Sequence, residues 1–108
     1  MTERTARFVR VGRVDDVPIG RAEVFDVEDR KIAVFRMEDG LYAIEDICTH
    51  DGGPLAEGEV EGDQVICPRH GARFSIKTGA ALSFPAVTPV ECYPVRVDGD
   101  DLLIGIID

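Results

Sequence analysis

The sequence lacks a hydrophobic run long enough to cross a membrane. Its longest apolar stretch, Leu102 to Ile107, is interrupted by Gly105, whereas a spanning helix needs about 20 apolar residues. The segment Met1-Thr2-Glu3-Arg4 also lacks the apolar core of a secretory signal. We therefore expect a soluble, unprocessed, cytoplasmic protein, and the length of 108 residues predicts one small domain.

Basic residues are scarce. The chain has 12 Lys and Arg against 21 Asp and Glu, a formal net charge of −9. This balance argues against binding to nucleic acid or to an anionic membrane surface, because both attract positive charge. A basic protein partner remains compatible with it.

Cysteine is also scarce. Three cysteines cannot all pair with one another, and a reducing cytosol keeps thiols from forming disulfides. Metal ligation is therefore the better explanation for these residues.

Convincing long amphipathic helices are missing, and short strands between turns account for nearly every segment. Apolar runs are brief, β-branched residues are frequent and turns marked by Gly recur, which predicts an all-β fold. We predict a hairpin at Glu28-Asp29-Arg30 and a tight turn at Asp39-Gly40, where glycine reaches a positive φ. The predicted strands of the first half are Phe8 to Val11, Arg21 to Val27, Lys31 to Met37 and Leu41 to Glu45.

Residues 46–85 differ from the rest of the chain in composition and in apolar periodicity. Glycine and proline crowd together there, and only Gln64 to Cys67 and Arg73 to Ile76 are expected to be extended. The β pattern resumes from Val90 to Val97, turns at residues 98–100 and ends with Leu102 to Ile107. We expect residues 1–45 and 86–108 to form one β base that carries 46–85 as a loop-rich insertion.

Two short segments within this insertion carry the chemistry. Cys48-Thr49-His50 and Cys67-Pro68-Arg69-His70 together hold both histidines and two of the three cysteines. Two thiolates and two imidazoles suit zinc or iron–sulfur chemistry, and composition alone does not decide between them. The order Cys, His, Cys, His is informative, because each loop then supplies one thiolate to one iron and one imidazole to a second.

At these residues the sequence resembles the Rieske iron–sulfur family, whose motif is Cys-x-His followed after a similar spacer by Cys-x-x-His. The neighbouring residues agree with that motif, since Gly52-Gly53-Pro54-Leu55 follows the first pair and Gly71-Ala72-Arg73-Phe74 follows the second. The resemblance implies an antiparallel β-sandwich or barrel base with a smaller loop-rich β subdomain that binds the cluster. Length and strand pattern are similar to those of the soluble bacterial Rieske ferredoxins.

The resemblance also implies the role of each ligand in one [2Fe-2S] cluster. Cys48 and Cys67 would bind one iron, and His50 and His70 would bind the other. Imidazole adds less negative charge than thiolate, so Rieske centres span about −150 to +300 mV while plant-type ferredoxins lie near −400 mV.

Departures from the high-potential members of the family place this chain low in the Rieske range. Those members carry two further cysteines that form a disulfide, where this chain has Gly53 and Arg69. They also donate hydroxyl hydrogen bonds to the cluster sulfurs, where this chain has Ala72 and Phe74. With fewer donors, the reduced state is stabilised less, and we expect a low potential.

The function implied by the resemblance is one-electron transfer without catalysis. Soluble Rieske ferredoxins take electrons from a flavin-dependent NAD(P)H reductase and pass them to a terminal oxygenase, often a ring-hydroxylating dioxygenase. One alternative is the small subunit of a nitrite reductase, although such subunits commonly lack the complete ligand set. The other is a zinc-binding interaction module without a redox role.

Several neighbours of the motif have both a structural and a functional interpretation. We expect Phe74 in the core, and Cys92 as a buried structural thiol within a strand. Pro85 resembles the proline loop that covers the cluster in this family. An acidic stretch is expected to be a solvated surface or, alternatively, a docking surface for a basic partner; it consists of Asp51, Glu57, Glu59, Glu61 and Asp63.

Overall fold

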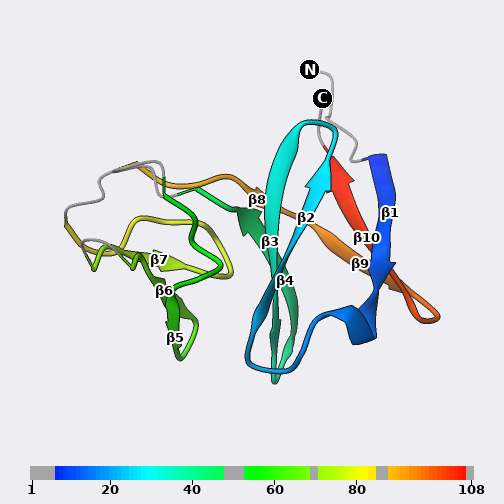
Figure 1. Ribbon diagram of the computed structural model, residues 1–108, viewed down its shortest axis with the longest axis horizontal. Helices are drawn as coiled ribbons and strands as arrows, with labels where there is room; N and C mark the ends of the chain where they lie inside the picture. Colours follow the sequence, from blue (N-terminus) through cyan, green and yellow to red (C-terminus); the bar gives the residue numbers. More distant parts are fainter. Residues whose placement is uncertain (1–6, 48–52, 69–70, 85–87, 107–108) are drawn as a thin grey trace, which may run out of the picture.

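The computed structural model describes residues 7–47, 53–68, 71–84 and 88–106, and the fold of these residues is all-β as predicted (Figure 1). One short 3-10 turn, Val14–Asp16, follows the first strand. Among these described ranges, no helix has the length and apolar character needed to cross a bilayer. The strands are β1 (Arg7–Arg13), β2 (Ala22–Val27), β3 (Arg30–Met37), β4 (Gly40–Glu45), β5 (Glu59–Glu61), β6 (Gln64–Ile66), β7 (Arg73–Ser75), β8 (Cys92–Tyr93), β9 (Val95–Asp98) and β10 (Asp101–Ile106).

The strands form three antiparallel sheets. Sheet A has the order β1-β10-β9, sheet B the order β2-β3-β4-β8, and sheet C the order β5-β6-β7. Sheet B lies between the other two, with sheet A on one side and sheet C on the other (Figure 1). In sheet A the first and last strands are neighbours, and Arg7 pairs with Ile106.

Strand β3 separates two hydrophobic cores. Successive side chains of a strand point to opposite faces, and the run from Ile32 to Phe35 is fully buried. Ile32 and Val34 pack in the core shared with sheet A, whereas Ala33 and Phe35 pack in the core shared with sheet C. This burial on both faces explains why β3 contains a continuous apolar run instead of alternating with polar residues.

The predicted strand positions are largely confirmed, and two of them need correction. Within residues 46–85 we expected only two extended segments, but Glu59–Glu61 is a third strand, β5. The predicted strand from Val90 to Val97 is wrong, because Pro94 separates β8 in sheet B from β9 in sheet A. Proline has no N–H to donate to a ladder, so the chain leaves one sheet there and enters the other.

The predicted hairpin between β2 and β3 is tighter than expected. Val27 pairs with Arg30, so the loop has two residues, Glu28 and Asp29, and both have positive φ (50° and 68°). This conformation matches the type I′ turn favoured in two-residue hairpins, although neither residue is glycine. The Nη1 and Nη2 groups of Arg7 donate hydrogen bonds to the Glu28 carboxylate at 2.6 and 2.8 Å. This ion pair links the turn to β1.

Sheet C falls within the predicted insertion of residues 46–85, and sheets A and B are built from residues on either side of it. The insertion packs on sheet B through its own buried side chains, Leu55, Val65 and Phe74 among them. Of the predicted ligands, Cys67 directly follows β6 of sheet C. The division into a base and a cluster-binding subdomain remains a prediction.

Candidate metal centre

Of the four predicted ligands, Cys67 is the one that the structure describes. It directly follows β6 and its side chain is 1% exposed. Cys48, His50 and His70 lie outside the described residues, as do Asp51, Arg69 and Pro85. The structure nevertheless describes the residues that bound both ligand loops, and these show how each loop is closed.

The second loop is closed by its own backbone. The Cys67 N–H donates to the Ala72 carbonyl at 2.7 Å, and the Gly71 N–H donates to the Cys67 carbonyl at 3.0 Å. Gly71 has a φ of +73°, which L residues with a side chain adopt only at a cost. The glycine therefore lets the chain turn back from β6 into β7 within six residues, and Cys67 is fixed at the start of this turn.

The first loop is closed by a side chain instead. Asp46 directly follows β4, and its Oδ1 accepts hydrogen bonds from the N–H groups of Leu55 and Ala56 at 2.8 and 2.7 Å. These bonds join the two ends of residues 47–54, the segment that contains Cys48 and His50. The sequence analysis missed Asp46; its signal was an Asp at a strand end, where aspartate commonly accepts bonds from nearby backbone N–H groups.

The surroundings of Cys67 suit a buried, nearly neutral metal cluster. Its thiol belongs to the apolar core that includes Leu55, Ala72 and Phe74. Beside it is a hollow of about 310 Å³ lined by the segment that leads into β5 and by the second loop, namely Glu57, Gly58, Glu59, Ile66, Cys67, Pro68 and Gly71. A soft thiolate beside a hollow in an apolar setting fits an iron–sulfur group, since thiolates offset the positive charge of the metal.

Ala72 and Phe74, which share this core with Cys67, carry no hydroxyl. Ala72 and Phe74 are both fully buried, so the expectation that Phe74 belongs to the core is confirmed. Gly53 is also buried. The expectation of a buried Cys92 is wrong: this thiol is exposed, because it lies on the short edge strand β8, where its side chain faces away from the core.

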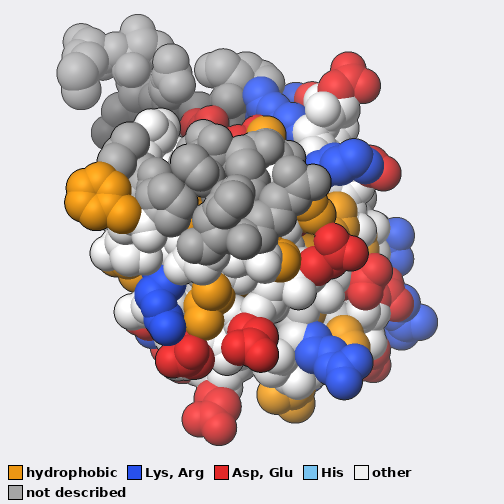
Figure 2. Space-filling view, turned by 60° about the vertical axis from the view of Figure 1, so that its left-hand side comes forward, with side chains coloured by type: hydrophobic (Ala, Val, Ile, Leu, Met, Phe, Trp, Pro, Cys, Tyr) orange, Lys and Arg blue, Asp and Glu red, His pale blue; other side chains and the backbone are white. Residues whose placement is uncertain are grey.

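The acidic stretch lies on the surface as predicted. Glu57, Glu59, Glu61 and Asp63 are all exposed, and Figure 2 shows acidic side chains interspersed with basic ones on the face of the molecule that carries sheet C. Arg73 partly neutralises this stretch, since it approaches Glu61 at 3.4 Å and donates to Gln64 at 3.3 Å. The surface near the second loop is therefore acidic with one half-buried arginine at its edge.

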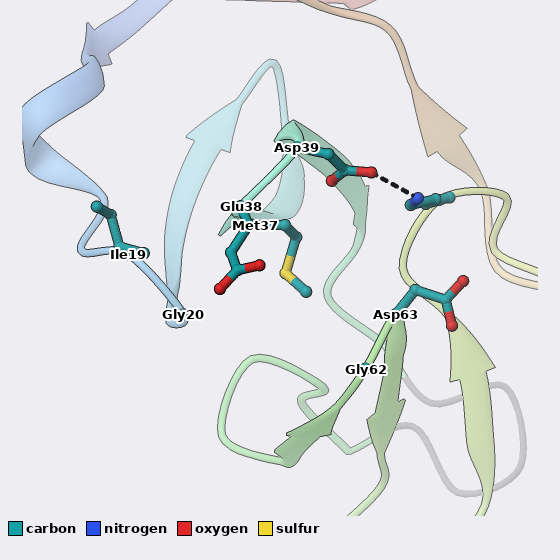
Figure 3. A pocket seen from close by; sticks show the side chains of 8 residues that line it. Ile19, Gly20, Met37, Glu38, Asp39, Gly62 and Asp63 are labelled. Carbon is teal, nitrogen blue, oxygen red and sulfur yellow. Dashed lines mark hydrogen bonds and ion pairs between the residues drawn. The ribbon is translucent and has the colours of Figure 1, made fainter.

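A wider hollow of about 590 Å³ lies at the other end of sheet C (Figure 3). Its walls include Ile19, Met37 and the β5–β6 turn at Gly62, and it contains neither cysteine nor histidine. At the edge of this hollow, the Nζ of Lys77 donates a hydrogen bond to Oδ2 of Asp39 at 2.7 Å. This hydrogen bond lowers the pKa of Asp39 and raises that of Lys77 from their usual values. Since β6 separates this hollow from Cys67, it is not part of the metal site.

The sequence of this chain matches a family model and the sequences of known proteins. A family model described as the Rieske [2Fe-2S] domain matches residues 7–94. A curated relative from Escherichia coli (strain K12), the ferredoxin subunit of 3-phenylpropionate/cinnamic acid dioxygenase, is 43% identical over 94 residues. The match covers 86% of this chain and 88% of the relative.

Solved structures agree with this result. The ferredoxin of carbazole 1,9a-dioxygenase from Nocardioides aromaticivorans superimposes with a TM-score of 0.85 at 36% identity, covering 90% of this chain and 95% of its own. A structure described as a complex of reduced oxygenase and oxidised ferredoxin in carbazole 1,9a-dioxygenase contains a chain that is 32% identical, with a TM-score of 0.83 and coverage of 91% and 92%. Nitrite reductase small subunits share only 21% and 22% identity, so their likeness shows the fold alone.

Proposed function

Since the chain belongs to the Rieske [2Fe-2S] family, we propose that Cys48 and Cys67 bind one iron of a single two-iron cluster and that His50 and His70 bind the other. The observation that carries this assignment is Cys67, a buried thiol at the start of a closed turn, beside a hollow that residues 57–59 and 66–68 line together with Gly71. The interleaved order of the ligands supports the pairing, because each loop then contributes to both irons.

The protein is an electron carrier and not a catalyst, as its relatives are ferredoxin subunits of dioxygenase systems. When bound, a Rieske cluster accepts and releases one electron. The chain itself would hold the cluster through Cys67, whose thiol lies in the apolar core that also contains Leu55, Ala72 and Phe74. We place its potential low in the Rieske range of about −150 to +300 mV, because Ala72 and Phe74 cannot donate hydroxyl hydrogen bonds to sulfur.

The electron acceptor is a terminal oxygenase, in keeping with the oxygenase–ferredoxin complex to which this chain is similar. A ring-hydroxylating dioxygenase is the acceptor class that the relatives favour. The proposed donor is a flavin-dependent NAD(P)H reductase, and the proposed compartment is the cytoplasm. Exposed carboxylates at Glu57, Glu59 and Asp63 would attract a basic partner surface and raise its association rate at low salt.

The test is to determine the metal and then the electron transfer. Protein purified after iron-replete expression should contain about two irons per chain, absorb visible light and give a rhombic electron paramagnetic resonance signal after reduction. A colourless protein that contains zinc would instead support the interaction module. A midpoint potential above about +100 mV would contradict the low-potential assignment.

Electron transfer is then followed directly by the visible spectrum. A reductase with NAD(P)H should reduce the cluster, and a dioxygenase with its aromatic substrate should reoxidise it. Cys67→Ser is the matched control, since it keeps the size of the side chain but removes the thiolate. If the wild-type cluster is reduced but no oxygenase of this class reoxidises it, while a nitrite reductase does, the alternative function is correct.

A further inference from the structure

The two ligand loops are closed by different kinds of bond. In the second loop, from Cys67 to Ala72, backbone hydrogen bonds join the described residues at its two ends. The first loop depends on the carboxylate of Asp46, which accepts two backbone N–H groups from the far end of the segment. A substitution of Asp46 therefore removes both of these side-chain bonds, whereas no substitution removes the backbone carbonyls that accept the described bonds of the second loop.

Asp46 is itself anchored on both sides. Its N–H donates to the carbonyl of Lys31 at 2.8 Å, which fixes it to β3, and the preceding N–H of Glu45 donates to Glu91 at 2.8 Å. At the other end, Leu55 is fully buried in the core with Phe74. The carboxylate thus links sheet B to this core across the base of residues 47–54.

Bonds of this kind are strong enough to affect the geometry of the loop. A hydrogen bond from an N–H to a charged acceptor is stronger than one to a neutral acceptor. Metal-binding side chains must be held within about 0.5 Å of the productive geometry. A loop with its two ends tied at 2.8 and 2.7 Å has far fewer conformations in which to present its ligands than an open one.

We propose that Asp46 is a positioning residue of the metal centre, which holds the loop containing Cys48 and His50 in the shape that binds iron. This inference rests on the proposed ligand set. Asp46 acts through its hydrogen bonds to Leu55 and Ala56, and its negative charge alone is not sufficient.

Two substitutions separate the hydrogen bonds from the charge. Asp46→Asn and Asp46→Ala both remove one negative charge, but the amide oxygen of asparagine can still accept both N–H groups. Asp39→Ala is the matched control. It also removes a carboxylate bonded at 2.7 Å, in this case to Lys77, at the turn between β3 and β4.

The measurements are made on the purified holoprotein: iron per chain, the line shape of the rhombic resonance signal, and the half-life of the visible absorption. We expect Asp46→Ala to shorten this half-life about tenfold and to broaden the signal, and Asp46→Asn to stay within about threefold of the wild type with an unchanged line shape. Asp39→Ala should behave as the wild type does. Far-UV circular dichroism verifies that each variant is folded.

The outcomes discriminate between the possibilities. If Asp46→Asn and Asp46→Ala behave alike, whether both keep the cluster or both lose it, the hydrogen bonds are not what matters and the inference is overturned. If Asp46→Ala cannot be purified in a folded state, a full iron content and wild-type line shape in Asp46→Asn support the inference, and their loss contradicts it. A wild-type protein without iron would refute the proposed ligand set before any variant is compared.

Discussion

Gly58 is the position where a single added methyl group should disturb the metal centre most directly. Gly58 lies in the hollow beside Cys67, and its N–H donates to the Leu55 carbonyl at 2.9 Å. A Cβ at this position would lie 2.0 Å from the carbonyl oxygen of Ile66 and 3.2 Å from that of Leu55. Ile66 is the last residue of β6 and directly precedes Cys67.

The size of the disturbance follows from these distances. A Cβ in a folded protein stays at least 3.0 Å from such an atom, so the segment around Gly58 and the end of β6 must separate by about 1 Å. Overpacking of this kind costs about 1–3 kcal/mol. This displacement is about twice the tolerance of about 0.5 Å within which a metal-binding constellation must be held, so Gly58→Ala should lose most of its iron.

Gly99→Ala is the matched control. Gly99 has a φ of +65° in the turn between β9 and β10, and no atom lies within 4 Å of its added Cβ. This substitution should cost about 1 kcal/mol through its backbone conformation alone, with the iron content unchanged. The assays are iron per chain and thermal unfolding by far-UV circular dichroism, in which 1 kcal/mol corresponds to about 4–8 °C. If Gly58→Ala keeps its full iron content, the contact between Gly58 and Ile66 does not determine the position of Cys67.

Three further predictions concern the cluster environment, the edge of the wider hollow and the core. Ala72→Ser should raise the midpoint potential, since a buried hydroxyl can donate to a cluster sulfur; an unchanged potential in direct electrochemistry would show that the side chain at this position does not reach the sulfur. The lowered pKa of Asp39 and the raised pKa of Lys77 mean that their ion pair stabilises the fold between about pH 4 and pH 10 and is lost as the pH falls below or rises above this window. Lys77→Met should therefore return the pKa of Asp39 to its usual range in an NMR titration, and a pKa that stays low would contradict this cause. Leu55→Ala should lower the free energy of unfolding by about 2–5 kcal/mol in urea titrations, whereas the control Leu82→Ala, at a side chain that is 47% exposed, should cost far less.

The sequence predicted most strands because alternating apolar residues and glycine turns are local signals. It missed β5, since Glu59-Val60-Glu61 carries one partly buried side chain between two exposed carboxylates and looks like a charged loop. The break at Pro94 was available in the sequence as a missing N–H donor. The sequence did not show that β8 and β9 belong to different sheets, because the strands with which they pair lie far along the chain.

The sequence predicted the candidate ligands, but it did not predict the role of Asp46 or the exposure of Cys92. The ligand set follows from residue order within two short segments, and the family match supports it. Asp46 was missed because its partners, Leu55 and Ala56, are nine and ten residues away and bond through backbone groups, which every residue carries. Cys92 was assigned to the interior because of its strand neighbours, whereas the structure gives it an edge position.

The pairing of Arg7 with Ile106 has a practical consequence for engineering. Both described ends of the chain lie at the same end of neighbouring strands in sheet A, and sheet B stands between that sheet and sheet C. A reductase domain, a surface anchor or an affinity tag joined at either described end would start from sheet A, whereas Cys67 follows β6 in sheet C (Figure 1). An artificial electron-transfer fusion therefore needs a linker long enough to pass around sheet B. The shortest linker that still allows electron transfer would then measure the distance between the fused redox centre and the cluster.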